Sequence, residues 1–299
     1  MRARARSLLA AVALLVLLNG CARSAPPVPT TPPQPTPVPR TSNELILATT
    51  TSTQDSGLLD VLVPLFQQQT GYQVKTISVG TGAALALGAR GEADVVLVHA
   101  PASEVQWMQQ GNGTERRLVM HNDFLIVGPP TDPAKIKGET DALTALKKIA
   151  DAKAPFVSRG DNSGTQQLEL SLWQKDNITP KGQPWYIESG TGMGQTLTIA
   201  DQRQAYTIAD RATFLSFSGR IQLPIMVERD PVLLNVYHVM PVSPTKFPNA
   251  PINAAGGKAF ADFMVAAETQ QLIAAFGTDK YGEALFVPDA GKSEAEVGL

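Results

Sequence analysis

A turn rich in glycine and hydroxyl residues follows an apolar run and precedes a helical pattern four times in this chain. The four turns are Thr49–Ser52, Gly80–Gly82, Arg159–Thr165 and Ser189–Gly192. A strand, a tight turn and a helix form the repeating unit of α/β proteins. Each turn places free backbone N–H groups at a helix N-terminus beside side-chain hydroxyls, an arrangement that binds anions. Because one Ser or Thr at such a turn is usually only a helix cap, the anion-binding interpretation depends on the repetition.

The order of apolar and amphipathic segments predicts two α/β lobes. Strand and helix patterns alternate over residues 44–127, which predicts a layer with a mainly parallel sheet. A second such unit occupies residues 129–234, and the strand and helices after it are too few for a third domain. We therefore expect a discontinuous first lobe (43–128 plus 235–299) and a second lobe (129–234), joined by a double crossover. Ligands of open α/β sheets bind at the C-terminal ends of strands, where the four turns lie, two in each lobe.

Residues 1–42 carry the signals of an exported protein. Met1–Arg6 contains three arginines, Ser7–Leu18 is an apolar run too short to span a bilayer, and the only cysteine follows at position 21. This resembles a bacterial lipoprotein signal, which implies a signal peptide over 1–20 and acylation of Cys21; a plain secretory signal with a coincidental cysteine is the alternative. Ala25–Arg40 is rich in proline, so residues 21–42 are expected to form an extended tether. We expect a periplasmic or cell-surface protein that is lipid-anchored to a membrane.

The composition argues against several classes of protein. A net charge of −2 gives no basic field for nucleic acid. One cysteine and three widely spaced histidines leave no disulfide framework and no metal site built on these residues. Neither a phosphate-binding P-loop motif nor a G-x-S-x-G elbow occurs, although Asp161–Gly164 faintly resembles a serine-protease nucleophile loop. We expect a protein that is not an enzyme, with no catalytic residue and no cofactor, and keep a secreted serine hydrolase as a distant alternative.

The stretch SRGDNSGT, which begins at Ser158, adds an arginine to one of the four turns. The guanidinium of Arg159 is always charged and presents a two-pronged donor face to a tetrahedral anion. The alternative is an ion pair with Asp161, which in a loop would be solvated and contribute little. Asp161 also suits the N-cap of the following helix. His99 and Arg211 are weaker candidates at predicted strand ends, and Arg211 is equally suited to pair with its neighbouring aspartate.

Six motifs together resemble the substrate-binding proteins of tungstate ABC importers. In order over residues 45–280 they are TTTSTQDSGLL from Thr49, VGTGAAL from Val79, GEADVVLVHAP from Gly91, NDFLIVGP from Asn122, SRGDNSGT from Ser158 and YTIADR from Tyr206. The resemblance implies the two-lobed type II periplasmic-binding-protein fold, which closes on an oxyanion. One departure is Gln166, where that family often has histidine.

The resemblance also implies the ligand, the partner and the site. The ligand would be tungstate or molybdate, and the partner an ABC permease in the membrane; we expect a monomer. No metal is implied apart from that of the oxyanion itself. The residues implied to contact the oxyanion are Thr50, Thr51, Ser52, Thr81, Arg159, Ser163, Gly164 and Thr165. Those expected one layer behind them are Asp161, Thr191 and Gly192.

The closest alternative is a protein that binds phosphate or another tetrahedral oxyanion. The order R-x-D-x-S-G-T from Arg159 also resembles the phosphate-binding loop of that group, where the acid accepts a hydrogen bond from protonated phosphate. Tungstate and molybdate are fully deprotonated near pH 7, so a carboxylate directed at them would be repelled. Asp161 therefore separates the two hypotheses: directed at the ligand it favours phosphate, and turned away as a cap it favours tungstate.

Overall fold

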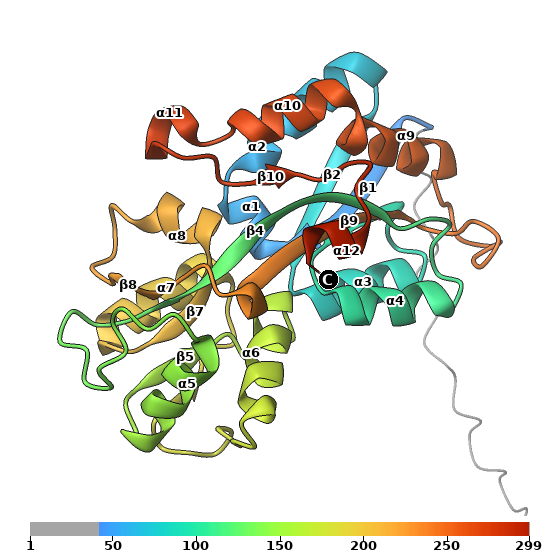
Figure 1. The fold of residues 1–299 in the computed structure, drawn as a ribbon. Coiled ribbons are helices and arrows are strands. Elements are labelled where there is room, and N and C mark those ends of the chain that lie inside the picture. Colours follow the sequence, from blue (N-terminus) through green and yellow to red (C-terminus); the bar gives the residue numbers. More distant parts are fainter. Residues whose placement is uncertain (1–41, 299) are drawn as a thin grey trace, which may run out of the picture. The chain divides into compact units, whose positions relative to one another are not determined.

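The computed structural model describes residues 42–298 (Figure 1). The predicted signal peptide, Cys21 and the tether up to residue 41 lie outside the described residues. The described residues belong to one compact unit. Within the described range, no helix combines the length and the apolar character that crossing a membrane requires.

Two β-sheets organise this unit. Six strands of the larger sheet lie in the order β10-β4-β9-β3-β1-β2, β7 and β8 pair with β4, and β5 and β6 form the smaller sheet. The strands are β1 (Glu44–Thr50), β2 (Gln73–Val79), β3 (Val95–Val98), β4 (Arg117–Val127), β5 (Phe156–Ser158), β6 (Tyr186–Glu188), β7 (Thr207–Asp210), β8 (Ile225–Val227), β9 (Leu234–Pro241) and β10 (Val287–Pro288).

The prediction of a mainly parallel sheet is wrong around β4 and β9. β1 is parallel to β2 and β3, and β5 is parallel to β6, but β4 and β9 pair with their neighbours only in antiparallel fashion. β4 carries the chain away from the first three strands and β9 brings it back, so the two run in opposite directions with Asn122 opposite Asn235. The order of strands and helices in a sequence does not reveal whether a returning strand is parallel or antiparallel to its neighbour.

Helices connect most of the strands. They are α1 (Thr51–Asp55), α2 (Leu58–Thr70), α3 (Thr81–Ala89), α4 (Pro101–Gln109), α5 (Ala142–Asp151), α6 (Gly164–Lys175), α7 (Met193–Arg203), α8 (Arg211–Phe217), the short 3-10 helix η1 (Pro231–Leu233), α9 (Ala254–Val265), α10 (Ala267–Ala275), α11 (Thr278–Tyr281) and α12 (Glu294–Val297). The turn expected after β1 contains α1, which Thr50 caps. Elements as short as β8, β10, α11 and α12 have two to four residues, too few for a hydrophobic period to register.

Buried side chains form separate cores in two regions. Alternate residues of β1 and β3 point to opposite faces of the large sheet, so Leu45 and Leu47 join one core and Ile46 and Ala48 another. Phe260 of α9 packs into the first of these cores, so the C-terminal helices return to this sheet. We call this region the first lobe.

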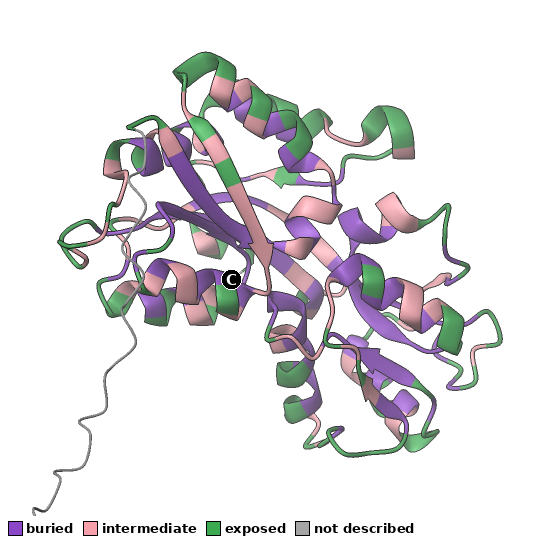
Figure 2. Ribbon diagram, turned by 180° about the vertical axis from the view of Figure 1, so that it is seen from behind, coloured by how far each residue is buried: buried purple, intermediate pink, exposed green. Residues whose placement is uncertain are grey.

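The second lobe surrounds the strands from β5 to β8. Its cores gather residues of α5, α6, α7 and α8. β4 contributes Val119 and Met120 to a core of the first lobe and Phe124 and Ile126 to one of the second. This connecting strand is buried for most of its length, with intermediate exposure at Arg117, His121 and Asp123 (Figure 2).

Candidate functional site

The predicted site residues lie where strands end and helices begin. Thr50 ends β1 and caps α1, Gly80 caps α3, Ser163 caps α6 and Gly192 caps α7. Arg159 directly follows the last residue of β5. The glycine and hydroxyl turns are therefore true strand-to-helix junctions, whose first-turn N–H groups point away from the helix body.

Contacts between the two lobes bring these junctions together. Arg159 Nη2 donates to Thr51 Oγ1 at 2.8 Å, and the backbone N–H of Gly164 donates to Thr81 Oγ1 at 2.9 Å. Gly192 lies against Thr51, since a Cβ atom at this glycine would stand 3.1 Å from the Thr51 side chain. The predicted residues of both lobes thus form one cluster.

Three hydroxyls of this cluster are oriented to donate. Thr81 accepts from Gly164, Thr51 accepts from Arg159, and Ser163 accepts from the backbone N–H of Gln166 at 3.2 Å. A hydroxyl that accepts on its lone pair keeps its own hydrogen for another acceptor. These side chains can therefore donate to an anion without losing the bonds that position them.

Arg159 is the only cation among the predicted site residues, and its side chain is 1% exposed. Its Nη2 atom has partners, whereas Nε, Nη1 and the neighbouring hydroxyl of Thr165 have none within the described chain. A buried donor without an acceptor costs about 1–3 kcal/mol, and more when it is charged. This donor set fits an oxyanion, which offers acceptors on every side.

Asp161 is turned back into its own loop. One carboxylate oxygen accepts from the backbone N–H of Ser163 at 3.1 Å, and the other accepts from Arg159. Left-handed backbone at Gly160 (φ +66°) and Asn162 (φ +55°) folds the loop around this carboxylate. The expectation of a solvated, weak Arg159–Asp161 pair is wrong, because the two side chains are only 1% and 16% exposed.

His99 holds two of the predicted hydroxyls. Its Nε2 atom lies 3.1 Å from both Thr50 Oγ1 and Ser52 Oγ. Burial, reinforced by the nearby charge of Arg159, lowers the pKa of His99 to about 3. The imidazole is therefore neutral at physiological pH and adds no positive charge to the site.

Two acids near the site, the half-buried Asp55 and the buried Asp210, were not singled out from the sequence. The carboxylate of Asp55 on α1 accepts from the backbone N–H of Gly194 in α7 at 3.2 Å, and burial raises the pKa of Asp55. Asp210 caps α8 by accepting from the backbone N–H of Thr213 at 2.8 Å. The acid that ends the YTIAD segment is visible in the sequence, where it was considered only as an ion-pair partner of Arg211.

The turn before α7 contributes less than the other three. The hydroxyl of Thr191 bonds with Ser189 and Thr196 in its own turn. Gly192 supplies close packing against Thr51, where a side chain would not fit without movement. This turn supports the site from behind through the glycine and through Ser189, whose hydroxyl donates to the backbone oxygen of Arg159 at 3.1 Å.

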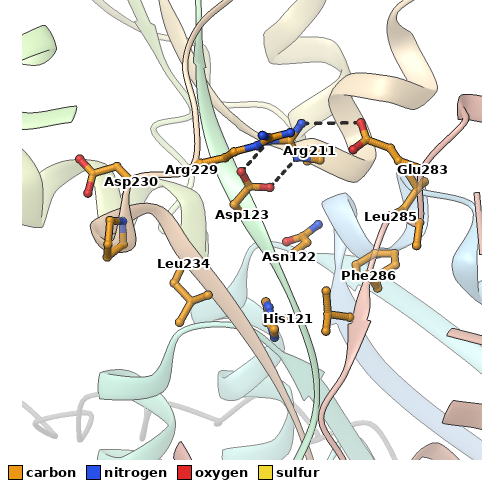
Figure 3. Close-up of a pocket in the computed structure, with 13 residues that line it drawn as sticks. His121, Asn122, Asp123, Arg211, Arg229, Asp230, Leu234, Glu283, Leu285 and Phe286 are labelled. Carbon is orange, nitrogen blue, oxygen red and sulfur yellow. Dashed lines mark hydrogen bonds and ion pairs between the residues drawn. The ribbon is translucent and has the colours of Figure 1, made fainter. Parts of the chain in front are cut away.

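Arg211 belongs to a different place. It donates to both carboxylate oxygens of Asp123 at 2.6 and 2.7 Å and to Glu228 at 2.6 Å, and it pairs with Glu283 (Figure 3). It neither joins the anion cluster nor pairs with Asp210. The pocket of about 360 Å³ beside it is lined by the carboxylates of Asp123, Asp230 and Glu283, which disfavour an anion there. Over residues 42–298, no three His, Cys, Asp or Glu side chains gather in a metal-binding group.

Comparison with known proteins identifies the family of this chain. The model of a PBP superfamily domain matches residues 26–268. The chain is 48% identical over 292 residues to the tungstate-binding protein TupA of Peptoclostridium acidaminophilum, covering 97% of this chain and 99% of that protein.

Two solved structures are similar as well. One is described as the tungstate ABC transporter from Geobacter sulfurreducens, with 43% identity, a TM-score of 0.70, and 79% of this chain and all of that chain covered. The other is the tungstate-binding protein TupA from Desulfovibrio alaskensis G20, with 42% identity, a TM-score of 0.67, and 83% and 99% of the chains covered.

Proposed function

Because this chain belongs to the family of TupA tungstate-binding proteins within the PBP superfamily, we propose that it captures tungstate for an ABC importer. It has the two-lobed periplasmic-binding-protein fold of that family. Molybdate, a dianion of nearly the same size, is the second ligand of this proposal. The protein performs no chemistry on the ion: it binds the ion between the lobes and delivers it to a membrane permease.

The observation that carries the proposal is the buried guanidinium of Arg159 with two unpartnered nitrogens among the residues described. Four hydroxyls with a hydrogen to donate accompany it, those of Thr51, Thr81, Ser163 and Thr165. Hydrogen bonds to charged groups contribute roughly 1.5–3 kcal/mol each, so six such donors give about 9–18 kcal/mol before desolvation. Nanomolar binding needs about 12 kcal/mol net.

The position of Asp161 supports a fully deprotonated ligand. Both of its oxygens accept from donors in its own loop, one from Ser163 and one from Arg159. Each oxygen therefore has a protein donor, and the carboxylate is directed into its own loop. This favours tungstate or molybdate over phosphate, as the cap interpretation of Asp161 requires.

Contacts between the lobes describe a closed arrangement. Asp55 on α1 accepts from Gly194 on α7, and Ser103 on α4 donates to Gln167 on α6 at 2.7 Å. We infer that these contacts hold the lobes together around the anion, and that the lobe boundaries fall at 128/129 and 234/235. Closure would present both lobes to the permease at once.

We also propose that the exported protein is anchored through acylated Cys21 and acts as a monomer. The proline-rich stretch before residue 42 would keep the binding lobes clear of the bilayer. Mass spectrometry of the mature N-terminus tests the anchor: a thioether-linked diacylglycerol on Cys21 is expected, and an unmodified cysteine would contradict it.

Calorimetry of the purified protein with tungstate, molybdate, phosphate and sulfate tests the function. We expect saturable heat with tungstate and molybdate at a stoichiometry of about one, because the site offers donors to a single tetrahedral ion. Heat from phosphate alone would overturn the proposal in favour of the phosphate alternative.

A further inference from the structure

Asp210 has a free, buried carboxylate oxygen, unlike Asp161. Its Oδ1 atom accepts from the backbone N–H of Thr213, but its Oδ2 atom has no partner within residues 42–298. The side chain is fully buried. An ionised oxygen in that position lacks the donors that a buried charge needs.

Charged groups from several elements act on Asp210. Arg159, which follows β5, favours its ionised form, and Asp55 on α1 opposes it. Tyr237 on β9 also lies within electrostatic reach, but burial raises the pKa of its phenol well above the usual range, so it stays neutral. Burial is the main effect on the acid itself and raises the pKa of Asp210 to about 6.

The adjacent cation, Arg211, does not neutralise Asp210. It directs its guanidinium to Asp123 and Glu228 instead. His99 is neutral because burial lowers its pKa to about 3. Arg159 is therefore the cation that favours the ionised form of Asp210, and it is also the cation that the anion would engage.

We propose that Asp210 is a proton-linked specificity residue: binding of the dianion is accompanied by uptake of one solvent proton on Asp210 Oδ2. This rests on the proposed function. A dianion at Arg159 cancels the positive charge that favours ionised Asp210 and places two negative charges nearby. One O–H bond forms, no other bond changes, and the neutral carboxyl becomes a hydrogen-bond donor in place of an unpaired acceptor. The site thereby selects ligands without a proton of their own.

Calorimetry in pairs of buffers with different ionisation enthalpies measures this proton directly. At pH 7.5, where free Asp210 is mostly ionised, we expect the uptake of nearly one proton for each tungstate ion bound. At pH 5, where the carboxyl is already protonated, the uptake should fall toward zero. The dissociation constant should rise by up to tenfold per pH unit above about pH 7, which is the linkage for one proton.

The variant Asp210→Asn keeps a capping oxygen and carries a permanent donor in place of the carboxyl O–H. It should bind tungstate without proton uptake and with an affinity that does not change between pH 5 and 8. The matched control is Asp141→Asn: Asp141 caps α5 through Thr144 in the same way but lies exposed. It should keep the wild-type proton uptake.

The outcomes separate this inference from the function on which it rests. Absence of tungstate binding in the wild type would remove the proposed function. Tight binding with no buffer dependence in the wild type, or uptake that persists in Asp210→Asn, would overturn the role of Asp210 alone. Persistent uptake would place the proton on another group, such as Asp55 or the ligand itself.

Discussion

The Nη2 atom of Arg159 lies 2.8 Å from the hydroxyl oxygen of Thr51, a residue 108 positions earlier in the chain. Arg159 follows β5 and Thr51 begins α1, so this hydrogen bond joins the two lobes. The same nitrogen also donates to Asp161. One edge of the guanidinium is thus fixed by protein atoms, which leaves the remaining N–H groups for a ligand.

Replacement of Arg159 should remove binding without unfolding the protein. Arg159→Ala is expected to weaken tungstate affinity at least a thousandfold, because about 4 kcal/mol or more of charge-assisted hydrogen bonding is lost. Arg159→Lys should weaken it less, since an ammonium keeps the charge but not the fork of donors. Calorimetry measures the affinities and circular dichroism the fold.

Arg90→Ala is the matched control for this series. Arg90 forms an exposed ion pair with Glu92, and both side chains are more than half exposed. Surface pairs of this kind contribute about 0–1 kcal/mol. The affinity of Arg90→Ala for tungstate should equal that of the wild type. Wild-type affinity in Arg159→Ala would refute the proposed site.

Gly80 tests whether the approach of the lobes is needed for binding. A Cβ atom at this position would stand 2.6 Å from the backbone oxygen of Asp161, which cannot move aside as a flexible side-chain end could. Gly80→Ala should therefore hinder closure and weaken tungstate binding at least tenfold with little change in thermal stability. Gly219→Ala, where a Cβ atom meets no neighbour within 4 Å, is the control. Equal affinity of both variants would argue against a tight approach.

His99 should contribute to binding in a manner independent of pH. Its Nε2 atom positions the hydroxyls of Thr50 and Ser52, so His99→Ala is expected to weaken tungstate binding several-fold at pH 5 and at pH 8 alike. The pKa of about 3 keeps the imidazole neutral throughout that range.

The same residue should make folding stability depend on pH in acid. The unfolded chain takes up a proton near pH 6.5 and the folded chain only near pH 3, so the folded state loses stability as pH falls through this window. His99→Ala should flatten the denaturation midpoints between pH 4 and 6.5. An unchanged pH dependence would contradict the neutral, buried imidazole.

Glu169 should lower stability above neutral pH. Its Oε1 atom accepts from Trp173 Nε1 at 3.0 Å and from the hydroxyl of Tyr186 at 2.7 Å, and burial raises its pKa from 4.5 to about 7. Glu169 holds its proton more tightly in the folded state than in the unfolded state. Its contribution to the free energy of unfolding is therefore greatest below pH 4.5 and is lost as the pH rises to 7. A shift of this size corresponds to about 3 kcal/mol.

Glu169→Gln keeps the accepting oxygen and removes the titration. Its free energy of unfolding should exceed that of the wild type at pH 8 and approach it at pH 4.5. Urea denaturation at the two pH values measures the difference. If the wild type were instead more stable than Glu169→Gln at pH 8, Glu169 could not be a buried, protonated acid.

Much of the fold was predictable because strand and helix periods are local properties. The apolar run ELILAT became β1, and the glycine turns became helix starts at Gly80 and Gly192. The antiparallel return of β9 beside β4 was not predictable, because register between strands more than a hundred residues apart leaves no local trace. Short elements such as β10 exist only because β4 offers an edge to pair with.

The residue types of the site could be read from the chain alone: an arginine that is always charged and hydroxyl residues at four strand-to-helix turns, whose chemistry suits an anion. The three-dimensional arrangement was needed to show which of these groups have hydrogen-bond partners in the protein and which do not. It turned Asp161 into its own loop and left Asp210 with an unpaired buried oxygen in the described chain. The physical reason is that residue type fixes charge and donor number, whereas burial and the partners that the fold supplies fix where a proton resides.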